Sequence, residues 1–198
     1  MRILRVDQGL EEAIEVIRSG GVVAHATETC YGFACDLTKS EAVERLFLLK
    51  GRLAAQSVSA LFPSIEEAKE WVEWNEKAEE LARKYLPGPL TIVLTVKKGM
   101  RTKGKGIGET MGVRISSHPI AQKLAELTRI PLSTTSANLH GKPNTYSVKE
   151  IVDQFSGREV VPDLILDSGE LPHAEPSTVI VIEQNKVKVV RRGSIDIG

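Results

Sequence analysis

The chain has 198 residues, 41% of them hydrophobic, and its 26 basic and 26 acidic side chains cancel to a formal net charge of zero. This size and composition predict a single domain, residues 1–198, with enough apolar material for one core. The neutral charge argues against a protein that binds nucleic acid or an anionic membrane through its overall field, so any site for a polyanion must be local.

The chain offers no sign of membrane insertion or of a structural metal. No stretch approaches the roughly 18 consecutive apolar residues that a membrane span needs, and the N-terminus lacks the apolar core of a signal peptide. Cys30 and Cys35 have no second Cys or His pair at zinc-binding spacing. We therefore expect a cytoplasmic protein with two reduced, buried thiols and no membrane contact.

The predicted elements alternate between strand and helix. A strand at 3–6 leads into a helix from Asp7, its expected N-cap, to the glycines at 20 and 21. Residues 21–36 favour extended chain and 40–49 return to a helical period. The remaining predictions, in order, are strand 58–62, helices 64–74 and 75–86, strands 91–96 and 112–115, helix 119–128, strand 131–136, helix 147–155, and strands 164–167, 177–182 and 186–191. This alternation predicts a mixed α/β chain with helices against a twisted sheet.

A segment rich in glycine and cations, residues 97–109, separates two predicted strands. It formally contains G-x-x-x-x-G-K, but Gly106 stands where a P-loop needs a magnesium-binding hydroxyl, and the residues that follow are typical of a strand. We reject a P-loop here and expect a solvated basic turn or a mobile loop. Contact of its cations with RNA or pyrophosphate is the alternative.

Lys50 and Arg52 flank Gly51 at the end of the helix predicted at 40–49. One interpretation is helix termination, in which Lys50 complements the helix dipole and Gly51 takes a left-handed cap. The other is that a chain reversal at Gly51 aims an ammonium and a guanidinium into one cleft suited to a triphosphate. These residues alone leave both interpretations open.

Other polar residues also have two interpretations each. The hydroxyls of 133–136 and Asn138 can donate to phosphate or ribose, or can form local side-chain turns. Arg114 lies in an otherwise apolar strand and needs a partner, which is either a protein carboxylate or a substrate carboxylate. Ser177 precedes a buried strand and Arg191 precedes a glycine turn, both of which are commonplace alone.

A set of collinear segments resembles the YrdC/TsaC family of threonylcarbamoyl-AMP synthases, from about Gly20 to Ile195: "ATETCYGFACD", "KGR", "LPGPLTIVL", "TMGVRISSHP", "STTSANLHGKP", "LILDSG", "PSTVIVI" and "VVRRGSI". The resemblance implies an α/β (α+β) fold, a YrdC-like twisted mixed β-sheet flanked by helices around a large open cavity. It implies a nucleotidyltransferase that makes L-threonylcarbamoyladenylate and pyrophosphate from L-threonine, bicarbonate and ATP, with Mg2+. The implied partners are the downstream tRNA threonylcarbamoyl transferase machinery, with a tRNA contact as a further one.

The resemblance also assigns residues. Lys50 and Arg52 match the family's K-x-R motif, in the catalytic role, and Ser136 and Asn138 match its S-x-N motif; the two motifs meet around ATP. The further implied ATP contacts are Gln56, Thr110, Asn144 and Arg191. The implied threonine contacts are Thr29, Tyr31, Arg114, Thr134 and Ser177, with Arg114 suited to the carboxylate. No protein ligand to a metal is implied.

The chain departs from the family pattern on the ligand side, at Ala26, Leu53, Gln56, Ser57, Leu61 and His140. These departures keep a non-catalytic RNA- or nucleotide-binding YrdC-like paralogue as the alternative. A third interpretation is carbamoyl transfer, as in hydrogenase-maturation carbamoyltransferases. Those proteins carry additional zinc-finger and acylphosphatase-like parts, which a chain of 198 residues lacks. We expect only the catalytic module, without the C-terminal domain of the longer family members. His118 is expected to cap a helix, and neither it nor His25 or His173 is assigned to catalysis.

Overall fold

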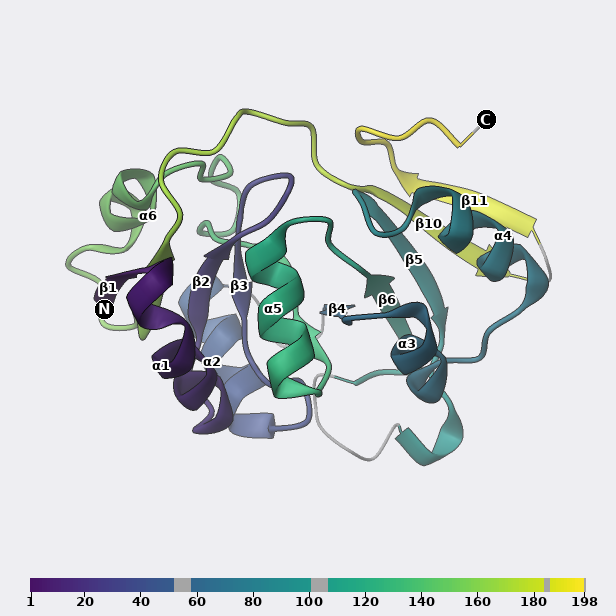
Figure 1. Ribbon diagram of the computed structural model, residues 1–198, viewed down its shortest axis with the longest axis horizontal. Coiled ribbons are helices and arrows are strands. Elements are labelled where there is room, and N and C mark those ends of the chain that lie inside the picture. Colours follow the sequence, from purple (N-terminus) through teal and green to yellow (C-terminus); the bar gives the residue numbers. More distant parts are fainter. Residues whose placement is uncertain (52–57, 101–106, 184–185, 198) are drawn as a thin grey trace.

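The computed structural model describes residues 1–51, 58–100, 107–183 and 186–197. The predictions for Arg52, Leu53, Gln56 and Ser57, and for the cations of 101–106, lie outside these residues. The described part is a mixed α/β chain with helices packed on two β-sheets (Figure 1), which confirms the expected fold class.

One sheet has five strands, in the order β1 (Arg2–Arg5), β9 (Leu164–Asp167), β2 (Val23–Ala26), β3 (Tyr31–Ala34) and β8 (Thr135–Ser136). Strand β9 runs parallel to both neighbours, whereas β3 is antiparallel to β2 and β8. The run expected to be extended over 21–36 is therefore a hairpin. Its turn forms because Thr27 Oγ1 accepts from the backbone amides of Thr29, at 3.2 Å, and Cys30, at 3.3 Å.

The other sheet has six strands, in the order β11 (Lys186–Arg191), β10 (Thr178–Glu183), β5 (Leu90–Thr95), β6 (Thr110–Arg114), β4 (Ser59–Leu61) and β7 (Leu132–Ser133). The single strand predicted at 131–136 is divided, because β7 belongs to this sheet and β8 to the first. Thr134 lies between them, at a point where the chain passes from one sheet to the other.

The helices of the described part are α1 (Val6–Arg18), α2 (Ser40–Lys50), α3 (Ile65–Trp71), α4 (Glu76–Tyr85), α5 (Pro119–Thr128) and α6 (Val148–Phe155), with a 3-10 turn η1 (Lys98–Met100). Helix α1 begins earlier than predicted: Asp7 lies in its first turn, and Arg5 occupies the N-cap without a side-chain hydrogen bond. Helix α3 ends before residue 74 because Val72 forms a β-bridge with Val96.

The core has two clusters on opposite faces of the five-stranded sheet. Helices α1 and α5 lie side by side on one face (Figure 1), where Ile17 and Leu124 are fully buried. On the other face α2 and α6 bury Leu46 and Phe155, and this cluster continues into the six-stranded sheet through residues such as Ile92. Burial of one such side chain contributes about 1.5–3 kcal/mol. Among the described residues, no helix has both the length and the apolar character of a membrane-crossing segment.

Candidate functional site

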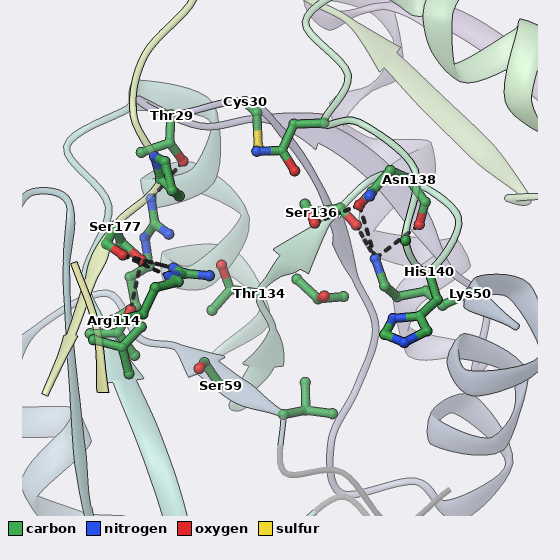
Figure 2. A pocket seen from close by; sticks show the side chains of 18 residues that line it. Thr29, Cys30, Lys50, Ser59, Arg114, Thr134, Ser136, Asn138, His140 and Ser177 are labelled. Atoms are coloured by element: carbon green, nitrogen blue, oxygen red, sulfur yellow. Dashed lines mark hydrogen bonds between the residues drawn. The ribbon is translucent and has the colours of Figure 1, made fainter. Parts of the chain in front are cut away.

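A cavity of about 300 Å3 lies where residues from the two sheets come together. Its described lining is Thr29, Cys30, Lys50, Val58, Ser59, Thr91, Arg114, Thr134, Thr135, Ser136, Asn138, His140, Gly141, Asn144, Pro176, Ser177, Val179 and Arg191. Figure 2 shows two groups of side chains facing each other across it, Lys50 with Ser136 and Asn138 on one side and Arg114 with Thr29 and Ser177 on the other.

Lys50 is the last residue of α2, and its ammonium is held in the first of these walls. Gly51 caps the helix in the left-handed conformation, with a φ of 63°, as the helix-termination interpretation predicted. The Lys50 side chain then reaches the cavity and its Nζ donates to the backbone oxygens of Ser136 and Asn138, the latter at 3.0 Å. It also donates to Asn138 Oδ1 at 3.2 Å, and the residue is only 4% exposed. The two interpretations of Lys50 are therefore compatible: it ends the helix and it brings a positive charge to the cavity.

Asn138 organises the loop that follows β8. Its Oδ1 accepts from Ser136 Oγ, and its Nδ2 donates to the backbone oxygens of Leu139, at 3.1 Å, and Lys142. These bonds close the loop so that Asn144 also lines the cavity. The local-turn interpretation of this segment is confirmed, and its residues also form part of the cavity wall.

Strand β6 supplies the opposite wall through its alternation. Met111 and Val113 are buried in the core, whereas Arg114 reaches the cavity from the other face of the strand. Arg114 Nη2 donates to Glu28 Oε1 at 2.9 Å and to Thr29 Oγ1 at 3.0 Å. Of the two partners that the sequence left open, the protein carboxylate is present, and it is Glu28. The arginine still lines the cavity, so a ligand can also reach it.

Glu28 is ionised at neutral pH. Burial by itself would raise its pKa, but the neighbouring charge of Arg114 and the hydrogen bond from Ser116 outweigh this effect, and the pKa of Glu28 is lowered from its ordinary value. The two side chains are 8% and 14% exposed, so this is a largely buried ion pair. Such a pair has a high desolvation cost, which its attraction roughly offsets.

Arg191, at the end of β11, lies on the same side of the cavity as Arg114. Its Nε and Nη2 donate to the backbone oxygen of Ser177, at 3.1 and 2.8 Å, and Nη2 also donates to Ser177 Oγ at 2.9 Å. Burial, and then the nearby charge of Arg114, lower the pKa of Arg191. An arginine still keeps its proton at neutral pH. Two guanidinium groups that repel each other therefore border one cavity, which favours a ligand with negative charge.

Seven further residues of the described lining carry a hydroxyl group: Thr29, Ser59, Thr91, Thr134, Thr135, Ser136 and Ser177. The described lining contains the basic side chains of Lys50, Arg114 and Arg191 and no Asp or Glu. Hydroxyl groups donate to and accept from phosphate, ribose and carboxylate oxygens without adding charge. The cavity therefore suits a polar anion that makes many hydrogen bonds.

Nine of the residues that the resemblance implied lie in this lining: Lys50, Ser136, Asn138, Asn144, Arg191, Thr29, Arg114, Thr134 and Ser177. Arg52 and Gln56 lie outside the described residues. Thr110, at the exposed start of β6, is not part of the lining. Tyr31 is not part of it either, because its fully buried side chain points its hydroxyl at the segment after β9, donating to Gly169 O at 2.8 Å and accepting from Ser168 N at 3.0 Å.

Some lining residues had no signal in the sequence that we used. Ser59 and Thr91 lie on β4 and β5, on either side of Gly112 in β6, and look like ordinary strand residues in the sequence. Their common position follows from the pairing of three strands that are distant in sequence. Side chains alternate between the two faces of a strand, so Gly112 lies on the same face of β6 as Arg114. This period of two is visible in the sequence and could have predicted that Gly112 shares the cavity face.

The described residues contain no group of three or more His, Cys, Asp or Glu side chains that could hold a metal ion. Cys30 and Cys35 are free and buried, and burial raises the pKa of both thiols, that of Cys35 to about 12. Neither thiol is therefore activated as a nucleophile. Separately, His118 accepts a hydrogen bond from Ile120 N and caps α5, as expected.

Comparison with known proteins identifies relatives of the whole chain. A family model for Sua5, YciO and YrdC, described as telomere recombination, matches residues 15–193. The threonylcarbamoyl-AMP synthase of Pyrococcus abyssi is 35% identical, in an alignment that covers 98% of this chain and 58% of that protein. The chain thus spans little more than half the length of this relative.

Two solved structures share the fold closely. The crystal structure of P. abyssi Sua5 complexed with L-threonine superposes with a TM-score of 0.87 at 34% identity, covering 98% of this chain and 58% of that one. The crystal structure of Escherichia coli YciO has a TM-score of 0.84 at 28% identity, covering 99% and 96% of the two chains. The similarity therefore extends over the described cavity and both sheets.

Proposed function

Because the chain belongs to the Sua5/YciO/YrdC family, we propose that it synthesises L-threonylcarbamoyladenylate from L-threonine, bicarbonate and ATP, releasing pyrophosphate. The observation that carries this proposal is the cavity itself. Lys50, Arg114 and Arg191 surround one hydroxyl-rich hollow that contains no carboxylate in its described lining. The name of the P. abyssi relative and the L-threonine complex of its structure support the choice of substrates.

The two walls suggest how the substrates are arranged. Arg114 has a planar guanidinium suited to the threonine carboxylate, and Thr29 lies beside it. Lys50 and the S-x-N segment, Ser136 to Asn138, form the opposite wall, where we place the phosphates of ATP. In this arrangement the Lys50 ammonium acts on the phosphates through its charge, while its hydrogen bonds keep the segment in place.

The chemistry follows from this arrangement. The amine of threonine takes up carbon dioxide, formed from bicarbonate, to give a carbamate and a proton. A carbamate oxygen attacks the α-phosphorus of ATP, the bond from that phosphorus to the bridging oxygen breaks, and pyrophosphate leaves with the electron pair. No side chain forms a covalent intermediate. The protein contributes by positioning the reactants and by stabilising the charge that develops on the phosphates.

Magnesium enters this proposal as part of the ATP complex. Mg2+ prefers carboxylate, phosphate and water oxygens, and the described lining supplies hydroxyl and amide oxygens but no carboxylate. We therefore expect the ATP phosphates and water to hold the ion. Bound there, it would offset phosphate charge, and the side chains described above would orient the reacting groups.

We place the product upstream of the machinery that transfers a threonylcarbamoyl group to tRNA, in the cytoplasm. Threonylcarbamoyladenylate is a mixed anhydride of a carbamic and a phosphoric acid, so it reacts readily with an amine. The consuming enzyme must bring it to the exocyclic amine of an adenosine in tRNA. A direct tRNA contact by this chain stays a prediction.

Pyrophosphate release tests the proposed function. The protein is incubated with ATP, bicarbonate and Mg2+, with and without L-threonine, and pyrophosphate is measured by a coupled enzymatic assay. We expect release that requires both L-threonine and bicarbonate. The non-catalytic alternative predicts ATP binding in a calorimetric titration without any release, and that result would overturn the proposal.

A further inference from the structure

Arg114 is held by only one of its three guanidinium nitrogens. Nη2 donates to Glu28 Oε1 and to Thr29 Oγ1, at 2.9 and 3.0 Å. Nε is buried and has no hydrogen-bond partner among the described residues, and Nη1 donates to none of them. Because Arg114 lines the cavity, Nη1 is the nitrogen that is left for a ligand.

Glu28 is itself held in place. Ser116 Oγ donates to its second oxygen, Oε2, and the Ser116 hydroxyl in turn accepts from the backbone amide of His118 at 3.1 Å. That amide lies at the N-cap of α5. A chain of hydrogen bonds therefore runs from a helix terminus through Ser116 and Glu28 to the guanidinium. Glu28 does not belong to the described lining of the cavity, so any effect that it has on a ligand must pass through Arg114.

Charge compensation alone does not explain this arrangement. A buried guanidinium needs a partner, and Glu28 satisfies that need with one oxygen. The bond from Ser116 to the other oxygen fixes the rotation of the carboxylate as well, which charge compensation does not require. Fixing the carboxylate fixes the direction from which Nη2 is held, and so the plane of the guanidinium. Recognition of a carboxylate by Nη1 depends on that plane, because the N–H bonds of the planar guanidinium lie in it.

We propose that Glu28 is a positioning residue that orients Arg114 so that its unoccupied guanidinium nitrogen meets the carboxylate of the amino-acid substrate. This inference rests on the proposed function and adds a specificity element to it. Discrimination for a free α-carboxylate comes from Arg114, and Glu28 and Ser116 keep Arg114 in the geometry that discriminates. The phosphates of ATP, which we place on the opposite wall beside Lys50, do not contact this pair.

The test compares L-threonine with L-threoninol, in which a hydroxymethyl group replaces the carboxylate. Pyrophosphate release is measured with each for the wild type, Glu28→Gln, Glu28→Ala and Ser116→Ala. We expect the wild type to have a much lower KM for L-threonine than for L-threoninol. In Glu28→Ala the KM for L-threonine should rise roughly tenfold to a hundredfold, the scale of a misplaced binding group, while the KM for ATP and for L-threoninol stays unchanged.

The other variants separate orientation from charge. Glu28→Gln keeps an oxygen that accepts from Arg114, so it should retain most of the preference for L-threonine. Ser116→Ala keeps the charge of Glu28 but removes the hydrogen bond that fixes its carboxylate, so it should lose part of the preference for L-threonine. This variant replaces Glu28→Ala in the test if Glu28→Ala fails to fold. Equal effects of Glu28→Gln and Glu28→Ala, with none in Ser116→Ala, would assign Glu28 to charge compensation and overturn the inference.

The wild-type measurements distinguish this inference from the proposed function. Turnover of L-threonine by the wild type, with the same preference over L-threoninol in every variant, would overturn the inference and leave the function standing. Absence of turnover in a folded wild type that binds ATP would overturn the function, and the inference with it.

Discussion

The ammonium of Lys50 donates a hydrogen bond to the backbone oxygen of Asn138, 3.0 Å away, across 88 residues of sequence. This bond joins the end of α2 to the loop after β8, and with it a helix terminus to one wall of the cavity. The same side chain therefore has a structural role, because it holds the wall, and an electrostatic role, because it carries charge into the cavity.

Replacement of Lys50 by Met should affect both roles. We expect pyrophosphate release to fall on the order of 10²- to 10³-fold, the usual effect of removing one donor that stabilises developing charge. We also expect the free energy of unfolding to fall by about 1–3 kcal/mol, because buried carbonyl oxygens lose their donor. Steady-state kinetics and urea unfolding measure the two effects, with Lys50→Arg as the variant that keeps the charge. Full activity of Lys50→Met would exclude an electrostatic role.

Gly112 lies between two hydroxyl-bearing residues on the cavity face. A Cβ at this position would be 2.5 Å from Ser59 Oγ and 2.9 Å from Thr91 Cγ2, closer than real Cβ atoms come. Gly112→Ala should therefore push both side chains towards the cavity and lower stability by about 1–3 kcal/mol. Thermal unfolding and the KM values for ATP and L-threonine measure this effect. The double variant with Ser59→Ala should recover part of the stability, and no recovery would show that Ser59 is not the cause.

The hydroxyl of Tyr31 fastens the segment between β9 and β10, which crosses from one sheet to the other (Figure 1). Ser177, at the end of this segment, lines the cavity. Tyr31→Phe should lower the free energy of unfolding by about 1 kcal/mol, because the Gly169 oxygen and Ser168 amide lose their partner. It should also speed hydrogen exchange at the Ser168 amide more than at amides of α1. Unchanged exchange at Ser168 would contradict this role.

His25 should make the protein less stable as the pH falls. Burial lowers its pKa from 6.5 to about 4, so between these values the unfolded chain binds a proton that the folded chain does not. The free energy of unfolding then decreases as the pH falls through this window, by about 3 kcal/mol in total. His118, whose pKa burial also lowers, acts in the same direction. Urea unfolding from pH 7 to pH 4 measures the slope.

The matched control for this prediction is His25→Gln, which removes one titrating group and leaves His118 in place. Its stability should depend less steeply on pH than that of the wild type over the same window. Identical slopes in the two proteins would show that His25 is protonated in the folded state as easily as in the unfolded one.

Local structure could be predicted from the sequence to a large extent. Helical periodicity located α2, α5 and α6, the left-handed Gly51 was predicted from residue type, and the cap at His118 was predicted from the His-Pro pair that the family shares. These features depend on neighbours within a few residues, which the sequence displays directly. The unexpected end of α3 depends on a β-bridge between Val72 and the distant Val96, and the sequence gives no local sign of this pairing.

Features that depend on strand pairing could not be predicted from the sequence. The division of 131–136 between two sheets follows from contacts with strands far apart in the chain, and it places Thr134 in the cavity. The need of Arg114 for a carboxylate was predictable, but its identity as Glu28 was not, because the two are 86 residues apart. The family resemblance located nine of the 18 described lining residues. It did not show that Tyr31 holds the segment after β9.

The most direct test of the proposed function follows the carbon of bicarbonate into the product. The protein is incubated with ATP, L-threonine, Mg2+ and ¹³C-labelled bicarbonate, and the adenylates are analysed by mass spectrometry at early times. We expect a new adenylate that contains both threonine and the labelled carbon, in an amount equal to the pyrophosphate released. Pyrophosphate release without such an adenylate, or no reaction in a folded protein that binds ATP, would contradict it.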